Sequence, residues 1–130
     1  MSLAARIAAL AGRIVLEVKT KIDAGHPGLA RAWVCFGYVG NQVVVRAAHN
    51  VASVTRLAAG RYRVHFASPL PDANYAWVGV ARSSTNSGTQ RLLIVRATAD
   101  EKTPTHVDVG CATTAASFAD SPEIDLVVYR

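Results

Sequence analysis

The sequence predicts a mainly β fold, an antiparallel β-sandwich or barrel-like domain preceded by a short amino-terminal α-helix. In the first 24 positions apolar residues recur every three or four residues, as on one face of a helix. From residue 30 on they recur every two residues, and turn residues interrupt them at intervals of about 8–15 residues. We therefore expect a helix in residues 1–24, a linker in 25–29 and a β domain in 30–130.

The helix is predicted from its apolar stripe, with Ser2 as its cap and "DAGHPG" as its stop. The stripe has nothing to bury against if the helix stands away from the β domain, so we expect it to mediate oligomerisation. The alternative is a helix packed on its own sheet. Strict heptads would place Glu17 and Lys21 in the seam, so a long coiled coil is not implied. The stripe consists of Leu3, Ile7, Leu10, Ile14 and Val18, continued by Ile22.

The amino-terminal stretch allows two further interpretations. Residues 1–15 carry Arg6 and Arg13 and no acid, a composition also typical of mitochondrial targeting segments. The segment "RIVLEV" is rich in β-branched residues and could form a strand. We favour the helix because the stripe continues through it. No apolar run approaches the roughly 20 residues of a membrane span, so membrane insertion is not expected.

Alternation of period two predicts about seven or eight strands. In "RYRVHF" the apolar positions Tyr62, Val64 and Phe66 share one face and the basic positions share the other. This is typical of a half-buried strand with a basic outer face. The predicted strands are residues 30–38, 41–47, 50–57, 61–66, the strand entered at Tyr75, 90–97, 105–112 and 123–130.

A stiff polar corner, "SPLPDANY", precedes the strand that begins near Tyr75. Pro69 and Pro71 cannot donate to a β ladder, so the segment must lie outside the sheet. Asp72 and Asn74 can accept hydrogen bonds from nearby backbone amides and thereby fix the turn. The corner is predicted to be a rigid scaffold element.

Charge is uneven along the chain. Residues 1–71 hold nine Lys or Arg against two acids, whereas residues 72–130 hold five against seven, for a total of +5. A basic half could face nucleic acid or an acidic glycan. Alternatively, the basic half is a solvated face, or it packs on the acidic half of another copy. We favour these alternatives over an anionic partner. Nucleic acid is not an expected partner, because the rings and the cations of "RYRVHF" lie on opposite faces.

No catalytic, metal or cofactor site is predicted. The sequence has no nucleophile elbow, zinc-protease motif or phosphate loop. Cys35 and Cys111 are expected to be small buried residues, although a bridge between them stays open. The histidines lack paired metal-ligand spacing, and His65 and His106 lie at outward strand positions, where a solvated side chain is expected. The loop acids are typical of solubilising positions. These histidines and acids are His26, His49, His65, His106, Asp72, Asp100, Glu101 and Asp108.

Residues 30–80 resemble a small β domain found in structural and tail-fibre proteins of tailed bacteriophages. Those domains tend to read Ala-Trp-Val-x-Phe, then Asn-Val-x-Ser-Ile/Val-Thr, Gly-x-Tyr-x-Val-x-Phe and Pro-Met/Leu-Pro-Asp-Ala-Asn-Tyr. This chain departs from the pattern at Cys35, in its glycine turn and in residues 78–90. The matching positions are Ala32-Trp33-Val34, Phe36, Asn50-Val51, Ser53-Val54-Thr55, Gly60, Tyr62, Val64, Phe66 and Pro69 to Tyr75.

The resemblance implies a non-enzymatic virion protein, a short homotrimeric fibre or spike that projects from the tail or head. It would assemble in the bacterial host cytoplasm, contact other virion proteins and aid host attachment. Two alternatives stay open, a capsid decoration protein without a receptor role and a stand-alone lectin-like module that binds anionic surface glycan. The sequence does not choose between head and tail.

Two loops are the candidates for contact with a host receptor, because loops on a rigid scaffold often carry binding. The first runs from Arg82 to Thr89 and the second from Thr98 to Pro104. The alternative is a solvated connection. The candidate receptor residues are Arg82, Ser83, Ser84, Thr85, Asn86 and Arg91.

Overall fold

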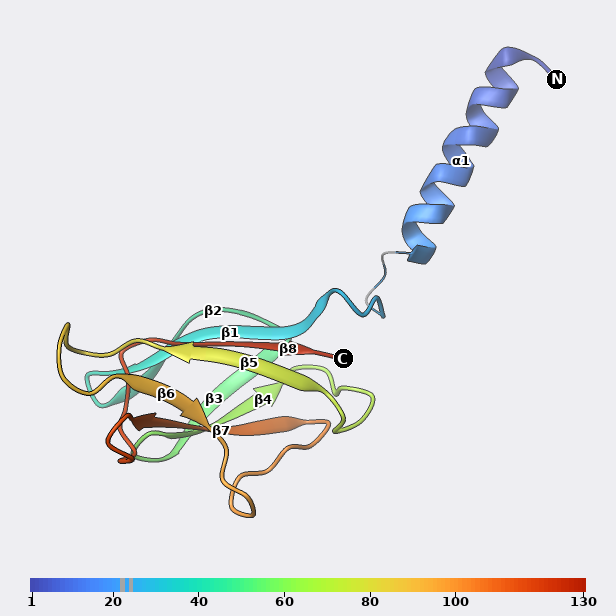
Figure 1. Cartoon of the computed structure of the whole chain (residues 1–130). Coiled ribbons are helices and arrows are strands. Elements are labelled where there is room, and N and C mark those ends of the chain that lie inside the picture. Colours follow the sequence, from blue (N-terminus) through green and yellow to red (C-terminus); the bar gives the residue numbers. More distant parts are fainter. Residues whose placement is uncertain (22, 24) are drawn as a thin grey trace.

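The computed structural model describes residues 1–21, 23 and 25–130 and confirms the predicted fold class. In this part of the chain one helix precedes eight antiparallel strands, arranged in two sheets of four. Because two separate sheets face each other, the domain is a sandwich rather than a barrel (Figure 1). The elements are α1 (Leu3–Lys21), β1 (Ala30–Val39), β2 (Gln42–His49), β3 (Val51–Ala58), β4 (Arg61–Phe66), β5 (Ala76–Ala81), β6 (Arg91–Ile94), β7 (His106–Thr113) and β8 (Ile124–Tyr129).

The chain passes repeatedly between the two sheets. Sheet I has the strand order β2-β1-β8-β5, and sheet II has the order β3-β4-β7-β6. The connections β2–β3, β4–β5, β5–β6 and β7–β8 each cross from one sheet to the other. Four crossings tie the two layers together, so neither sheet can separate without moving the other.

The core lies between the sheets and follows the predicted alternation. On β4 the aromatic and valine positions are buried, as expected. Phe36 of sheet I meets Tyr62 of sheet II edge to face, with ring centroids 5.2 Å apart, a geometry favoured by aromatic pairs. The other main core residues are Ala32, Val34, Val64, Phe66, Val107, Val109, Cys111, Ile124, Leu126 and Val128.

Three tight connections need left-handed backbone. Gly40 and Asn41, between β1 and β2, both have a φ of 61°, which suits a two-residue hairpin. Gly60 has a φ of 65°, and a Cβ there would lie 2.4 Å from the carbonyl oxygen of Cys111. Asn50, at φ 52°, is the single residue between β2 and β3. Its side-chain amide accepts from the Ser68 amide at 2.7 Å, and this bond holds the corner in place.

The polar corner is confirmed as a scaffold element that leads the chain from β4 into β5. The backbone amide of Asn74 donates to the Asp72 carboxylate at 2.8 Å, while Leu70 and Tyr75 are buried on either side. Asp72 also forms an ion pair with Arg130, at 2.6 Å. Hydrogen bonds from Arg130 and from the Asn74 amide lower the pKa of Asp72 to about 2. The corner is therefore tied to the far end of β8 as well as to itself.

The uneven charge of the sequence is compensated within the chain at three basic residues of the first half, Arg56, Arg61 and Arg63. Arg56 in the basic half pairs with Asp120 at 2.7 Å. Arg63 pairs with Asp108, also at 2.7 Å. The interpretation that we favoured, a solvated face or packing on another copy, is thus corrected at these positions: the two halves of one chain fold against each other.

The helix ends earlier than predicted, at Lys21 instead of residue 24. Positions 22 and 24 lie outside the described residues, and with them the last residue of the predicted stripe. Ser2 caps the helix as expected, since its hydroxyl accepts from the Ala5 amide at 3.2 Å. "RIVLEV" is helical and not a strand. No helix among the described residues is long and apolar enough to span a bilayer.

Candidate functional site

The predicted apolar stripe of α1 is exposed along its whole length. No residue of α1 is buried, and Figure 1 shows the helix projecting from one end of the sandwich. The structure therefore does not show the alternative, a helix folded back on its own sheet. The exposed fractions of the predicted stripe residues are 74% at Leu3, 59% at Ile7, 56% at Leu10, 55% at Ile14 and 55% at Val18.

Sheet I carries a second exposed apolar surface on the side away from the core, which we call outer face I. Trp33 of β1 lies opposite Val127 of β8, and Val127 lies opposite Val78 of β5. These three side chains form one row across three strands. Trp33 is 39% exposed and Val78 is 59% exposed. Val80 of the edge strand β5 and Tyr129 of the inner strand β8 extend the exposed apolar surface.

The two cysteines lie on different sides of the sandwich. Cys35 is on outer face I, half-buried, and a hydrogen bond to Asp125 together with partial burial raises the pKa of its thiol. Cys111 is in the core, where burial raises the pKa of its thiol to about 11. Both are free thiols. The bridge that the sequence left open is not formed, and only Cys111 is fully buried as expected.

On the opposite side of the molecule, outer face II of sheet II, the strand β7 is covered. All residues of β7 from Val107 to Ala112 are buried, because segments of the same chain lie over the strand. In segment 95–105, the Glu101 backbone carbonyl accepts from the Asp108 amide, and the Glu101 amide donates to the Asp108 carboxylate. In segment 114–123, Phe118 forms a bridge with Ala112.

A cluster of ion pairs and hydrogen bonds holds segment 95–105 against β4 and β7. The Asp108 carboxylate, 1% exposed, accepts two hydrogen bonds from the Arg63 guanidinium at 2.7 and 2.8 Å. Burial by itself raises the pKa of Asp108, but the bonds from Arg63 and from the Glu101 amide outweigh burial, and the pKa is lowered. Glu101 also contacts Arg63 at 3.1 Å and His106 at 2.8 Å. The loop acids are structural here, not merely solubilising.

His106 was predicted to be a solvated side chain, and this prediction is wrong. Its Nε2 lies 2.8 Å from the Glu101 carboxylate and its Nδ1 lies 3.2 Å from the Thr103 hydroxyl. This hydroxyl–imidazole–carboxylate order resembles a catalytic triad. However, the Thr103 hydroxyl accepts from the amides of Thr105 and His106, which is the pattern of a turn. The turn accounts for the arrangement without a catalytic role.

In the described part of the chain, a pair of neighbouring histidines raises the question of a metal site. No three His, Cys, Asp or Glu side chains there lie close enough together to hold an ion. His65 of β4 lies next to His106 of β7, with ring centroids 6.1 Å apart, and its Nε2 is 3.2 Å from the Thr55 hydroxyl. This pairing follows from the register of β4 with β7.

The first candidate receptor loop is exposed, but part of its polar surface is used internally. The Thr85 hydroxyl donates to the Ser87 carbonyl at 2.7 Å, and the Ser83 hydroxyl accepts from the Thr85 amide. Arg82 lies 3.5 Å from the Glu123 carboxylate. Arg91 donates to the backbone carbonyl of Asp120 at 3.4 Å. Ser84 and Asn86 are exposed at the tip of the loop.

The second candidate loop, Thr98 to Pro104, has a scaffold role that the sequence did not reveal. It forms the cover of β7 described above, and the Pro104 carbonyl accepts from the Leu70 amide at 2.8 Å. Lys102 donates to the Tyr75 carbonyl at 2.8 Å. The loop therefore joins β7 to the polar corner. Its charged residues looked free in the sequence because their partners are distant along the chain.

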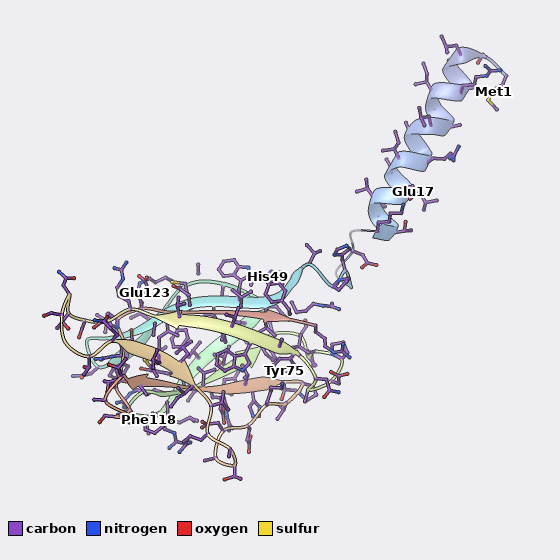
Figure 2. The ribbon with its side chains drawn as sticks, viewed as in Figure 1. Met1, Glu17, His49, Tyr75, Phe118 and Glu123 are labelled. Carbon is purple, nitrogen blue, oxygen red and sulfur yellow. The ribbon has the colours of Figure 1, made fainter. Side chains whose placement is uncertain are left out.

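Sequence reasoning also missed a groove at the end of the sandwich near the linker. It has a volume of about 550 Å³ and is lined by Leu29, Arg31, His49 and Pro69, among others. His49 lies on this end of the molecule, next to the linker (Figure 2). The Asn50 side chain shapes the groove by donating to the carbonyls of Arg31 and Ser68, each at 3.2 Å.

Comparison of the chain with protein-family models, with curated proteins and with solved structures finds no match. Its function is therefore inferred from its own geometry. The features that bear on function are the exposed stripe of α1, outer face I, the loop from Arg82 to Thr89 and the groove near the linker.

Proposed function

We propose that this chain is a non-enzymatic structural protein of a bacteriophage virion, a short homotrimeric fibre or spike in which α1 joins the copies and the sandwich projects. The observation that carries the proposal is the apolar stripe of α1, which has no buried residue. Most of the stability of a helix in a protein comes from packing of its apolar face, and α1 has no such packing within its own copy. Burying each large apolar side chain contributes about 1.5–3 kcal/mol, so association of stripes stabilises the helices.

The resemblance to phage domains supports the setting. Its motif residues occupy core and corner positions, such as Phe36 and Tyr62 in the core and Asn50 and Gly60 at left-handed turns. Residues of this kind specify a fold and not a binding site. A rigid sandwich on a helical stem suits a projecting virion component that contacts other virion proteins and, through its loops, a host surface.

The oligomeric state of the full chain tests the assembly. We expect wild type to sediment at three times the chain mass and Ile7→Asp to sediment as a monomer, because a carboxylate in the apolar contact has no partner. Ala8→Asp is the matched control, since it adds the same charge to the same turn on the side away from the stripe. A monomeric wild type, or an Ile7→Asp variant that stays assembled, contradicts self-association through α1.

The virion setting has its own test. The chain should be detected in purified phage particles at a constant ratio to the major structural proteins. Its absence from particles, together with an enzymatic role in the host cell, contradicts the proposal. Adsorption of particles that carry Arg82→Ala and Arg91→Ala then separates a receptor-binding fibre from a decoration protein. A receptor contact through two charge-assisted bonds predicts a loss of about tenfold or more.

A second candidate is the binding of an anionic glycan, which the groove near the linker favours. Arg31 and His49 line it together with apolar residues, a combination common in small-ligand sites. Glycan arrays with wild type and with His49→Ala test this function. Retention of an acidic glycan by wild type alone supports it, and equal or absent retention contradicts it.

A further inference from the structure

The apolar stripe of α1 is short for a contact that must hold copies together. Leu3 to Ile14 follow heptad spacing, but Glu17 and Lys21 occupy the next seam positions and form an ion pair with each other at 2.7 Å. The apolar seam therefore spans about two heptads, whereas sustained coiled coils use at least three or four.

The area of the stripe leads to the same conclusion. A buried aliphatic side chain removes roughly 60–120 Å² from water, so five of them remove roughly 300–600 Å². A stable interface buries about 800 Å² on each partner. Association through α1 therefore needs further apolar surface from elsewhere in the chain.

Outer face I has this surface. Trp33, Val127 and Val78 form its central row, and the described residues place no segment of the chain over it. Monomeric proteins rarely leave contiguous apolar patches of more than a few hundred Å² exposed. The side chains on this face are larger and less polar than those of the candidate receptor loop.

Connectivity brings this face close to the contact between helices. Only residues 22–29 separate α1 from β1, a central strand of sheet I. Eight residues span at most about 29 Å. Copies joined through α1 therefore hold their β1 strands, and with them their outer faces I, near one another.

We propose that outer face I is the second part of the contact between copies of this chain, so that the sandwiches pack together through it as the helices associate. This inference rests on the proposed self-association through α1. It also bears on the number of copies. Ile at the a positions with Leu at the d positions, as in this stripe, favours two strands. A trimer therefore needs a contact outside the helix, and outer face I is that contact.

Thiol labelling of the full chain tests the proposal. In a Cys35→Ser background, Val78→Cys places a thiol on outer face I, and Leu92→Cys places one on outer face II. The two positions are matched, because each is an exposed apolar residue on an edge strand, 59% and 50% exposed. In the assembled protein we expect maleimide to react at least about tenfold more slowly at position 78 than at position 92.

The Ile7→Asp change, added to both variants, separates the explanations. Once the copies dissociate, position 78 should react as fast as position 92. Equal rates in an assembled protein overturn the inference while leaving association through α1 intact. Slow reaction at position 78 in the dissociated chain also overturns it, because the cover then belongs to the same copy. A monomeric wild type overturns the proposed function and the inference together.

A charge on the face provides a second measurement that does not depend on labelling. Val78→Glu should raise the concentration of half-dissociation by about tenfold or more, whereas Leu92→Glu should change it by less than about twofold. Both changes lie on exposed edge strands, so the monomer should fold in each case. Equal effects of the two changes contradict a specific role of outer face I.

Discussion

Both outer faces of the sandwich consist of every second residue of their strands, but one face is exposed and the other is partly covered by the same chain. On outer face I, Trp33, Val127 and Val78 form an apolar row with no cover among the described residues. On outer face II, segments 95–105 and 114–123 of the same chain bury β7 on both sides. Ion pairs around Asp108 hold the first of these segments in place.

The two faces differ in what their side chains need from their surroundings. Outer face II carries a buried charge, and its loops supply the partners that a buried charge requires. Outer face I carries apolar side chains, whose burial is favourable against almost any apolar surface. The chain therefore completes the polar face by itself and leaves the apolar face for another molecule, which we propose to be a second copy.

The largest expected effect comes from removing the buried charge on outer face II. Asp108→Ala should lower the free energy of unfolding by about 3–5 kcal/mol, because Arg63 then keeps its charge without its main partner. Glu101→Ala, at a side chain that is 57% exposed, is the control and should cost less than about 1 kcal/mol. Urea denaturation measures both. Equal losses would show that Asp108 is not the residue that fastens the cover.

An intermediate effect depends on pH and concerns segment 114–123. Hydrogen bonds from Arg56 lower the pKa of Asp120 to about 2, below its ordinary value of 3.8. Since the folded-state pKa lies below the unfolded-state value, the ionised carboxylate stabilises the fold above about pH 4. This contribution is lost as the pH falls from about 4 to about 2. At about 1.4 kcal/mol per pH unit between the two pKa values, it amounts to about 2 kcal/mol.

Urea denaturation between pH 2 and pH 6 checks this expectation, over the range of about 4 to 2 in which the carboxylate protonates. Wild type should lose about 2 kcal/mol more than Asp120→Asn on acidification. Asp125→Asn, on outer face I, serves as the control, because no ion pair of Asp125 is found in the described part of the chain. If Asp120→Asn leaves the dependence of the free energy of unfolding on pH unchanged, Asp120 is not the carboxylate responsible.

The smallest effect is expected on outer face I. In the dissociated Ile7→Asp chain, Val80→Thr should change the free energy of unfolding by less than about 0.5 kcal/mol, because Val80 is 64% exposed. Val109→Thr, the same change at a buried position of β7, should cost about 1–3 kcal/mol. Chemical denaturation compares them. A large loss at Val80 would mean that the face is already covered within one copy.

The fold class and most element positions could be predicted because they depend on local patterns. Alternation on β4 correctly placed Tyr62, Val64 and Phe66 in the core. Asp72 and Asn74 correctly predicted the corner, since an Asx turn needs only two neighbouring residues. The candidate functional residues could be predicted less well from the sequence. The role of the loop from Thr98 to Pro104 could not be read, because it depends on contacts with β7 and with the polar corner.

The sequence by itself determined the alternation of the strands, the polar corner and the apolar stripe of α1, since each depends on residues a few positions apart. Only the tertiary structure decided which outer face is covered. Arg63 and Asp108 are 45 positions apart, and the paired residues in the row of Trp33, Val127 and Val78 are further apart still. Strand order and register bring such residues together, and no local pattern encodes either one.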